Sequence, residues 1–508
     1  MLPIFSTSIF VGILTWVLYK LWCRYRFFKL RDEIGVPGPS PSFLYGNLDE
    51  VIEKRKEVGY ECNHEMMIQY HEKYGKTFGF YSGKRLEIFI SEEEMIKEIF
   101  VKNFSNFSDR GRVGVFDVNQ LNESLLQLTR ENGWKEVRSV ISPTFSNGKM
   151  KAMHEEIRDK INVFLQILEE KSVNSDIGDI YDEYQALTLD VIGKCAFAIE
   201  CNSQRDRNDV FYQQARRFFK YIDIGHSPLV IFSMILPEFD YLWQLFYKFS
   251  NLAKAEEPLT GGLDDVYERR KSGECNESVD LLKLLLDNES SEKALTKRRV
   301  IENCFAFLLA GYETTSTALT YCTDLLARHP DVQQKLYEEI VETKEKKGLT
   351  FDSIHAMEYL DCVYKESLRV YPPVIHFVNR MCLKDTVIRG QKIPAGVIVN
   401  LLPYTVHMSE QNWEEPRKFI PERFLNWSDK SSLKWIPFGV GPRYCVGMRF
   451  AEMEFKMTLT RVLEKFIIQK GDNYTMMQPH VQGLIMRPLN PVNLKLTIRD
   501  EFKTRKNA

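Results

Sequence analysis

The sequence predicts a mainly α-helical fold with small β-sheets, built as a single large domain behind an N-terminal membrane-spanning helix. Helical periodicity dominates residues 134–465, and the strand-like runs are short and interrupted by glycine and proline. The first 19 residues carry no charge and are mostly apolar. Neither an internal repeat nor a convincing linker follows Pro41, which favours one domain over several.

The composition of the chain excludes several classes of protein. The chain has 508 residues, 44% of them hydrophobic, which is enough for a large core, and a formal net charge of -2. Charges of both signs are interspersed without a basic stripe, so nucleic-acid binding is not expected. The ten cysteines include no Cys-x-x-Cys pair and no zinc spacing, which suits reduced thiols in a cytosolic compartment.

Residues 1–22 are predicted to be a transmembrane signal-anchor. About 20 apolar residues can cross a bilayer. A basic cluster follows them, so the positive-inside rule places the rest of the chain in the cytosol; it comprises Lys20, Arg24, Arg26, Lys29 and Arg31. The alternative is a cleaved secretory signal, which would carry its charge before the apolar run and end at small residues.

Residues 23–41 are predicted to be a basic and proline-rich linker, and residues 42–508 the catalytic domain. The run from Val36 to Pro41 contains three prolines. Proline density favours a stiff, extended segment that would orient the domain on the membrane. An ordinary loop is the alternative.

Several secondary elements follow from local pattern. Residues 77–81 and 85–90 flank Ser-Gly-Lys and predict a β-hairpin, and a helix is expected over 93–102. Short strands are expected within 386–402, and another strand pair near the end is broken at 488–491.

The segment 229–249 is rich in aromatic and aliphatic residues around Pro237. We expect a core helix here. The alternative is a membrane-dipping loop at a substrate entrance, which a spread of exposed apolar side chains would favour.

Residues 297–329 contain no proline and predict one helix of 33 residues, roughly 50 Å long. Between residues 303 and 323 the only charge is Glu313. A carboxylate is costly to bury in such a helix unless it is paired or used. Six serine and threonine residues between 314 and 323 make a second membrane span the weaker alternative.

The centre of this helix reads Ala310-Gly311-Tyr312-Glu313-Thr314-Thr315. Glycine inside a helix costs about 1 kcal/mol relative to alanine, which indicates a need for space. A threonine hydroxyl can bond to a carbonyl one turn back and bend the helix. The helix centre therefore combines space, a hydroxyl donor and an acid.

The most informative segment is 438–447, which fits Phe-x-x-Gly-x-Arg-x-Cys-x-Gly. Cys445 lies just before a run, 449–463, with helical periodicity, so the helix dipole favours its thiolate. Glycines let the backbone fold closely around a sulfur or a flat ligand. A lone cysteine is usually buried and inert, but the four surrounding pattern positions favour a function.

This loop resembles the haem-thiolate loop of the cytochrome P-450 monooxygenases. The resemblance implies haem b (iron protoporphyrin IX), with Cys445 as the axial iron ligand and Phe438 beside the cofactor. The helix centre resembles the oxygen-activation motif of the family. It implies catalytic roles for Thr314 and for the adjacent acid Glu313, and places the pair Ala310–Gly311 against the iron.

The same family places an ion network elsewhere in the chain. Glu366 and Arg369 lie three residues apart, on one face of a predicted helix. They resemble the family's Glu-x-x-Arg pair, and the run Pro421-Glu422-Arg423-Phe424 resembles the motif whose arginine, here Arg423, completes a buried triad. The implied role is structural.

Haem propionates require cationic donors. The resemblance implies contacts from Trp134, Arg138, Arg443 and Arg380, with Arg110 as a weaker candidate. Trp134 and Arg138 form the family's Trp-x-x-x-Arg motif. The alignment at Arg380 is uncertain by one residue, and His376 is the alternative there.

The resemblance covers the whole chain and is strongest to the animal microsomal, drug-oxidising branch. It implies a monooxygenase that inserts one oxygen atom from O2 into a lipophilic small molecule of the xenobiotic, steroid or fatty-acid class. Electrons would come from NADPH through NADPH–cytochrome P-450 reductase, with cytochrome b5 as a further donor. The expected location is the endoplasmic reticulum membrane, in contact with lipid and with the catalytic domain in the cytosol.

Two other functions remain open at this stage. One is a non-catalytic haem-binding sensor or carrier, against which the intact Glu313 and Thr314 argue. The other is a reductase-independent peroxide isomerase of the same family. Such members typically depart from the oxygen-activation motif.

Overall fold

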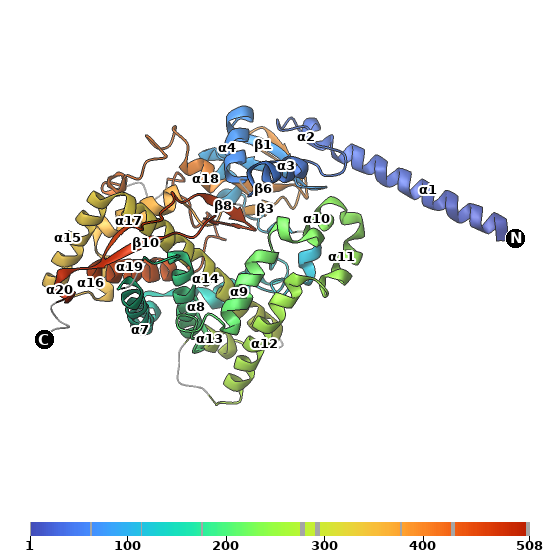
Figure 1. Cartoon of the computed structure of the whole chain (residues 1–508). Helices are drawn as coiled ribbons and strands as arrows, with labels where there is room; N and C mark the ends of the chain where they lie inside the picture. Colours follow the sequence, from blue (N-terminus) through green and yellow to red (C-terminus); the bar gives the residue numbers. More distant parts are fainter. Residues whose placement is uncertain are drawn as a thin grey trace.

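The computed structural model describes residues 2–60, 63–112, 114–173, 176–274, 280–289, 295–375, 378–427 and 432–503. Helices make up most of the body, and small sheets lie at its edges (Figure 1). The predicted mainly helical fold with small β-sheets is therefore confirmed.

The longest helix, α14 (Lys297–Arg328), runs through the middle of the body and matches the predicted 297–329. It begins at Thr296, whose hydroxyl accepts a hydrogen bond from Arg299 N. It ends before Pro330, the first residue of the next helix. Nearly every residue from Val300 to Leu326 is buried, because neighbouring helices surround α14 on most sides.

The remaining helices between α5 and α14 are α6 (Trp134–Ile141), α7 (Asn147–Ser172), α8 (Ile180–Phe197), α9 (Val210–Tyr221), α10 (Pro228–Ile235), α11 (Asp240–Tyr247), α12 (Asn251–Lys271) and α13 (Leu281–Asp287). Those after it are α15 (Pro330–Lys347), α16 (Phe351–His355), α17 (Glu358–Val370), α18 (Pro403–His407), α19 (Met448–Lys465) and α20 (Asp500–Lys503). The N-terminal part holds α1 (Leu2–Phe27), α2 (Leu30–Glu33), α3 (Leu48–Val58), α4 (Asn63–Tyr74) and α5 (Glu93–Lys97). The expected helix over 93–102 changes after α5 into a π-helical turn at Glu98–Lys102.

A four-stranded sheet has the order β1-β2-β6-β3, formed by Thr77–Tyr81, Leu86–Ile90, Ile398–Leu401 and Asn379–Met381. The predicted hairpin β1–β2 is antiparallel with Thr77 opposite Ile90. Strand β6 runs parallel to β2 and antiparallel to β3, where Arg380 lies opposite Val399. The sheet thus includes Arg380 together with β1 and β2, which are about 300 residues away in sequence and are separated from β3 by β6.

Three two-stranded sheets complete the β structure. They pair β4 (Thr386–Ile388) with β5 (Gln391–Ile393), β7 (Phe466–Lys470) with β10 (Leu494–Ile498), and β8 (Pro479–Gln482) with β9 (Ile485–Pro488). The expected break at 488–491 separates β9 from β10.

Two apolar clusters position the segment around Cys445. The larger one contains α14 and the helices around it, including Phe450 and Met453 of α19. The second lies against the four-stranded sheet and includes Phe100 of the π-helical turn together with Ile436 and Val440. The loop that carries Cys445 is therefore held between the helical core and the sheet.

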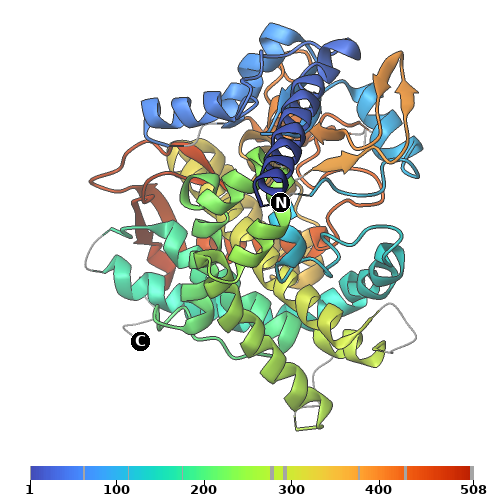
Figure 2. The ribbon, with the colours of Figure 1, turned by 90° about the vertical axis from the view of Figure 1, so that its right-hand side faces the viewer.

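Helix α1 leaves the body as a separate rod (Figures 1 and 2). Large apolar side chains along it are exposed, among them Phe10, Ile13, Leu18 and Trp22. Within the described residues, no helix taken singly has both the length and the hydropathy of a membrane span. The predicted anchor is therefore not confirmed.

The expected core helix over 229–249 is wrong. Pro237 has no backbone N–H to continue a helix, and the chain breaks into α10 and α11 with a bend of 105°. Many apolar side chains of this pair are exposed: Phe232, Phe239, Tyr241, Leu242, Leu245 and Phe246. The pair passes the combined membrane-span criterion that no single described helix passes.

Candidate functional site

The backbone around Cys445 folds into a tight loop that only this pattern of glycines permits. Cys445 N donates to the carbonyl of Phe438 at 2.9 Å, and Tyr444 N donates to that of Gly441 at 2.9 Å. Gly441 has a φ of 71°, and a Cβ atom there would lie 1.9 Å from the carbonyl oxygen of Phe100. The loop leads directly into α19.

Cys445 retains accessible surface, and the space beside that surface is called the hollow below. The residue retains accessible surface, yet burial is the main influence on its thiol and raises the pKa. A backbone hydrogen bond at Gly447 and the guanidinium groups of Arg138 and Arg110 act in the opposite direction, because they stabilise a thiolate.

A matching strip of accessible surface interrupts the otherwise buried α14. Ala310 is exposed, and Phe307, Gly311 and Thr314 are partly accessible. Their spacing of three, four and seven residues places them on one face of the helix. Phe307 stacks on Phe145 at 5.8 Å between ring centres, and Phe145 in turn meets Phe450 of α19 at 6.5 Å. The strip therefore borders the same region as the Cys445 loop.

Thr314 and Gly311 have different local roles. Thr314 Oγ1 donates to the carbonyl of Ala310 at 2.7 Å, the back-bond by which threonine bends a helix. A Cβ atom at Gly311 would lie 2.9 Å from the side chain of Ile192 on α8. Glycine at this position therefore provides the space for the close approach of α8.

Glu313 is buried and fully engaged with neighbouring elements. Tyr181 Oη donates to its Oε1, and Gln185 Nε2 donates to its Oε2 at 2.9 Å. Arg487 Nη1 of β9 lies 3.6 Å from Oε1. Burial and the Glu313 charge raise the pKa of Tyr181, so the phenol stays protonated and donates. The carboxylate is thus held between α8 and β9, one residue from Thr314.

Sequence reasoning missed Tyr181, Gln185 and Arg487. Tyr181 and Gln185 are four residues apart on α8 and so share a face, which was the available signal. Arg487 lies 174 positions after Glu313, and nothing in the linear sequence relates the two.

Four arginines converge near Cys445. Burial lowers the pKa of Arg380 and of Arg443, and Arg110 lowers both further by repulsion between like charges. Repulsion from Arg138 also lowers the pKa of Arg110 and of Arg443. Such a group of cations is costly to bury unless an anion joins it.

The hydrogen bonds of these arginines leave donors for an anion. Arg443 donates to the carbonyls of Ser108 and Leu128, each at 2.6 Å. Arg380 is 1% exposed and donates to the carbonyl of Asn379 at 2.6 Å, but its Nε has no hydrogen-bond partner in the described part of the chain. The residues therefore fit a flat cofactor that carries two carboxylates and an iron beside Cys445. His376 lies outside the described residues.

Trp134 and Arg138 occupy successive turns of α6, next to the Cys445 loop. The guanidinium of Arg443 lies 4.4 Å from the centre of the Trp134 ring. Arg138 lies 4.9 Å from the centre of the Tyr444 ring. These contacts join α6 to the loop.

Glu366, Arg369 and Arg423 meet, as the motifs predict. Glu366 and Arg369 have fully buried side chains joined by two hydrogen bonds of 2.7 and 2.8 Å. Arg423 Nε lies 3.3 Å from Glu366 Oε1. Arg369 also donates to the carbonyls of His407, Pro416 and Lys418 at 2.7 to 3.0 Å. The network fixes a long irregular segment before the Cys445 loop.

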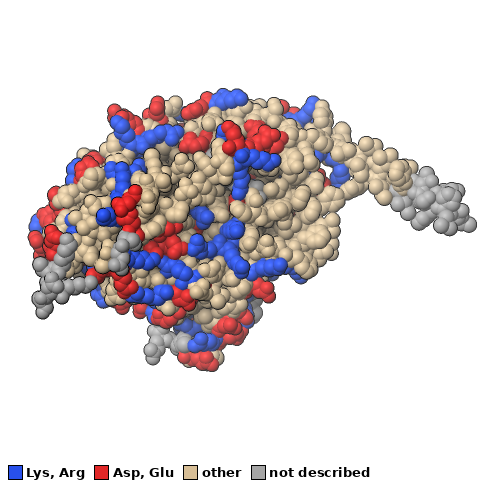
Figure 3. Space-filling model, in the orientation of Figure 1, with Lys and Arg blue, Asp and Glu red and all other residues tan. Residues whose placement is uncertain are grey.

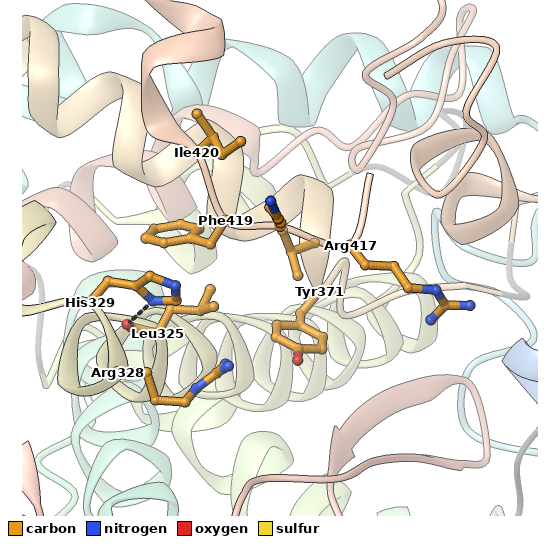
Figure 4. A pocket seen from close by; sticks show the side chains of 9 residues that line it. Leu325, Arg328, His329, Tyr371, Arg417, Phe419 and Ile420 are labelled. Atoms are coloured by element: carbon orange, nitrogen blue, oxygen red, sulfur yellow. Dashed lines mark hydrogen bonds between the residues drawn. The ribbon is translucent and has the colours of Figure 1, made fainter. Parts of the chain in front are cut away.

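A separate pocket of about 320 Å³ lies near this network (Figure 4). It is lined by the end of α14 at Arg328 and His329, by Tyr371 after α17, and by residues 417–420. None of the residues that the sequence predicts for the site lines it. It borders the loop whose carbonyls hold Arg369.

Comparison with known proteins agrees with this geometry. The family model for cytochrome P450 matches residues 36–496. Cytochrome P450 3A12 of Canis lupus familiaris is 33% identical over 517 residues, which cover 98% of each chain. Cytochrome P450 3A11 of Mus musculus is 31% identical over 513 residues, covering 96% of this chain and 98% of the relative. Cytochrome P450 3A6 of Oryctolagus cuniculus is 33% identical over 487 residues, covering 93% of each.

Matches of this extent fix the family, and with it a haem cofactor, a redox partner and a lipophilic substrate. The chain belongs to the cytochrome P450 family and is a monooxygenase of that family.

Proposed function

We propose that this enzyme inserts one oxygen atom from O2 into a lipophilic small molecule of the xenobiotic, steroid or fatty-acid class. Two electrons come from NADPH through NADPH–cytochrome P-450 reductase, with cytochrome b5 as a second donor. The observation that carries the proposal is the meeting of the Cys445 loop, a cluster of buried arginines and the accessible Thr314 strip of α14 around one hollow.

The cofactor in this proposal is haem b. Cys445 would bind its iron, and Arg138, Arg380 and Arg443 would hold its propionates, with Trp134 alongside. Phe438, Ala310 and Gly311 would line the cofactor site. When bound, the haem supplies the oxidising chemistry, and the protein supplies orientation and protons.

The side chains of α14 carry the proton-handling role. The Thr314 hydroxyl holds a proton at the border of the hollow, where it now bonds to Ala310. Glu313 is the neighbouring acid, and Tyr181 and Arg487 hold its buried carboxyl group in place. Protons would reach the site through Glu313 and Thr314. The buried side chains of α14 and its neighbours would otherwise exclude water.

Turnover tests this proposal. Wild-type enzyme reconstituted with reductase, NADPH and a lipophilic substrate should consume NADPH in step with product. Thr314→Ala should keep NADPH consumption but divert it to peroxide or water, because the hydroxyl no longer directs the proton. Full coupling in Thr314→Ala would remove that role. Reductase-independent turnover of a hydroperoxide would instead indicate a peroxide isomerase.

We also propose that the enzyme is held on the endoplasmic reticulum membrane by residues 1–22, with its catalytic domain in the cytosol. The support is the exposed apolar surface of α1 and of the α10–α11 pair, which lie at the same end of the molecule. Figure 3 shows few charged side chains over that end. Both surfaces suit contact with lipid.

Glycosylation tests the orientation. The sequence contains Asn-x-Ser/Thr sites at Asn103, Asn106, Asn122, Asn276, Asn288, Asn426 and Asn473, and all of them should remain unmodified if the domain is cytosolic. An endoglycosidase mobility shift of the membrane-expressed protein would overturn the proposed topology.

A further inference from the structure

Tyr444 precedes the iron-binding cysteine and is not specified by the sequence motif of the loop. Its side chain is 46% exposed, which is unusual for an aromatic residue at the edge of a buried site. The guanidinium of Arg138 lies over its ring, 4.9 Å from the ring centre. The contact joins the Cys445 loop to α6.

Two cation–π contacts link the Cys445 loop to α6, and each element supplies the cation in one of them. The loop contributes an arginine, Arg443, to the ring of Trp134 on α6, at 4.4 Å. The helix contributes Arg138 to the ring of Tyr444 in the loop. Trp134 and Arg138 are four residues apart and therefore share one face of α6. Consecutive loop residues thus engage successive turns of the helix.

Arg138 needs such a partner because its surroundings are positively charged. Arg110 and Arg443 place like charges within electrostatic reach of its guanidinium. Burial lowers the pKa of Arg138, and Tyr444 opposes that effect. A carboxylate in place of Tyr444 would also hold Arg138 but would neutralise it. An aromatic face holds the guanidinium and leaves its N–H edge available to another anion.

We propose that Tyr444 is a positioning residue that holds Arg138 in the orientation in which its N–H groups meet a haem propionate. The inference rests on the proposed haem site. It adds to that site a residue which acts through Arg138 and which no motif of the loop requires.

Three variants of the full-length protein test this role. Tyr444→Leu removes the ring, and Tyr444→Phe keeps it. Arg138→Gln removes the cation. The measurement is the rate of haem transfer from each holoprotein to excess apomyoglobin. We expect about three- to tenfold faster loss in Tyr444→Leu, as removal of one cation–π contact implies, and a rate within about twofold of wild type in Tyr444→Phe.

The second measurement is the midpoint potential of the haem. In Tyr444→Leu, the Arg138 charge should move away from the propionate, which should lower the midpoint potential. Tyr444→Phe should have the wild-type potential. If the substitutions only disturbed the loop structure, the midpoint potential would not depend on whether residue 444 carries an aromatic ring. In the Arg138→Gln background, Tyr444→Leu should change neither quantity further. Should Tyr444→Leu fail to fold, Tyr444→Met replaces it in the same comparison.

The outcomes separate the two proposals. If the wild-type protein binds haem with a thiolate signature but Tyr444→Leu retains haem and potential as wild type does, the role of Tyr444 is refuted and the proposed function stands. The role is equally refuted if the effects of Tyr444→Leu and Arg138→Gln add independently. If the wild-type protein shows no thiolate-bound haem, the proposed function fails and this inference fails with it.

Discussion

At the scale of single residues, the burial of charge explains why several side chains tolerate no change. The side chains of Glu366 and Arg369 have no contact with solvent, and each satisfies the other directly. A pair of this kind contributes little when compared with an apolar pair, but removal of one member leaves an unpaired charge in the interior. The unpaired charge would destabilise the segment that leads to the Cys445 loop, because Arg369 binds the carbonyl groups of that segment.

Glu366→Ala and Arg369→Ala should each lose about 3–5 kcal/mol of stability, because each leaves one buried charge without its partner. We expect protein without haem, measured as the ratio of haem to protein after purification. The matched control is Glu342→Ala, which breaks the exposed pair with Lys346 and should change little. Normal haem content in either buried-pair variant would contradict the structural role.

The residues proposed to carry the chemistry could be singled out from the sequence because each occupies a motif with a fixed spacing. Cys445, Arg443 and Thr314 lie where the patterns of the sequence place them. Their partners were not predictable. Tyr444 meets Arg138 across more than 300 residues of sequence, and that contact depends on how α6 packs on the loop.

At the scale of elements, helix α14 and its neighbours decide where the hollow forms. Its length and ends followed from the sequence because proline and a threonine cap mark them. The segment 229–249 was mispredicted, because apolar periodicity alone does not distinguish a buried helix from a bent pair with an exposed apolar face. Strand order also required the structure, since β6 pairs in parallel with β2 over a distance of about 310 residues.

The junction of α12, α11 and α14 contains a buried carboxyl group. Glu256 of α12 is 1% exposed, and burial raises its pKa to about 7, with a further contribution from Glu302. Tyr247 and the backbone N–H of Gln120 act in the opposite direction. The folded state therefore binds a proton that the unfolded chain releases near its ordinary pKa of 4.5.

The sign of the pH dependence follows from this difference. As pH rises from about 4.5 to 7, the folded protein loses stability relative to the unfolded chain, by about 3 kcal/mol in total. Glu256→Gln removes this loss. We expect the variant to melt above wild type at pH 8, with the difference shrinking toward pH 5. Glu257→Gln, at an exposed neighbouring position, is the control and should follow wild type at every pH. An equal pH profile for Glu256→Gln and wild type would refute the assignment.

At the scale of the whole molecule, α1 is tied to the apolar end of the body. Arg24 Nε donates to the carbonyl of Phe43 at 2.7 Å, and its Nη2 donates to that of Ile235, the last residue of α10, at 2.7 Å. Glu238 lies 3.7 Å from Arg24 and 2.8 Å from Lys84 of the β1–β2 turn. The bend between α10 and α11 is thus held from two sides.

Arg24→Ala should loosen this bend, because three carbonyl groups, those of Phe43, Leu44 and Ile235, and the carboxylate of Glu238 lose a cationic partner. We expect faster hydrogen–deuterium exchange in residues 228–247 of the membrane-bound protein, with exchange in α14 unchanged. Arg26→Ala is the control, since the Arg26 side chain is 54% exposed and pairs with Glu33 on the surface. Unchanged exchange in the α10–α11 pair would show that Arg24 does not hold it.

The central claim is that the Cys445 thiolate binds haem iron beside the arginine cluster. The most direct test is the carbon monoxide difference spectrum of the dithionite-reduced membrane fraction, for wild type and for Cys445→Ser. The account predicts a Soret band at the long-wavelength position of the family in wild type and its absence in Cys445→Ser. A band only at the ordinary haem-protein position in well-folded wild type would contradict it, because no thiolate would then reach the iron.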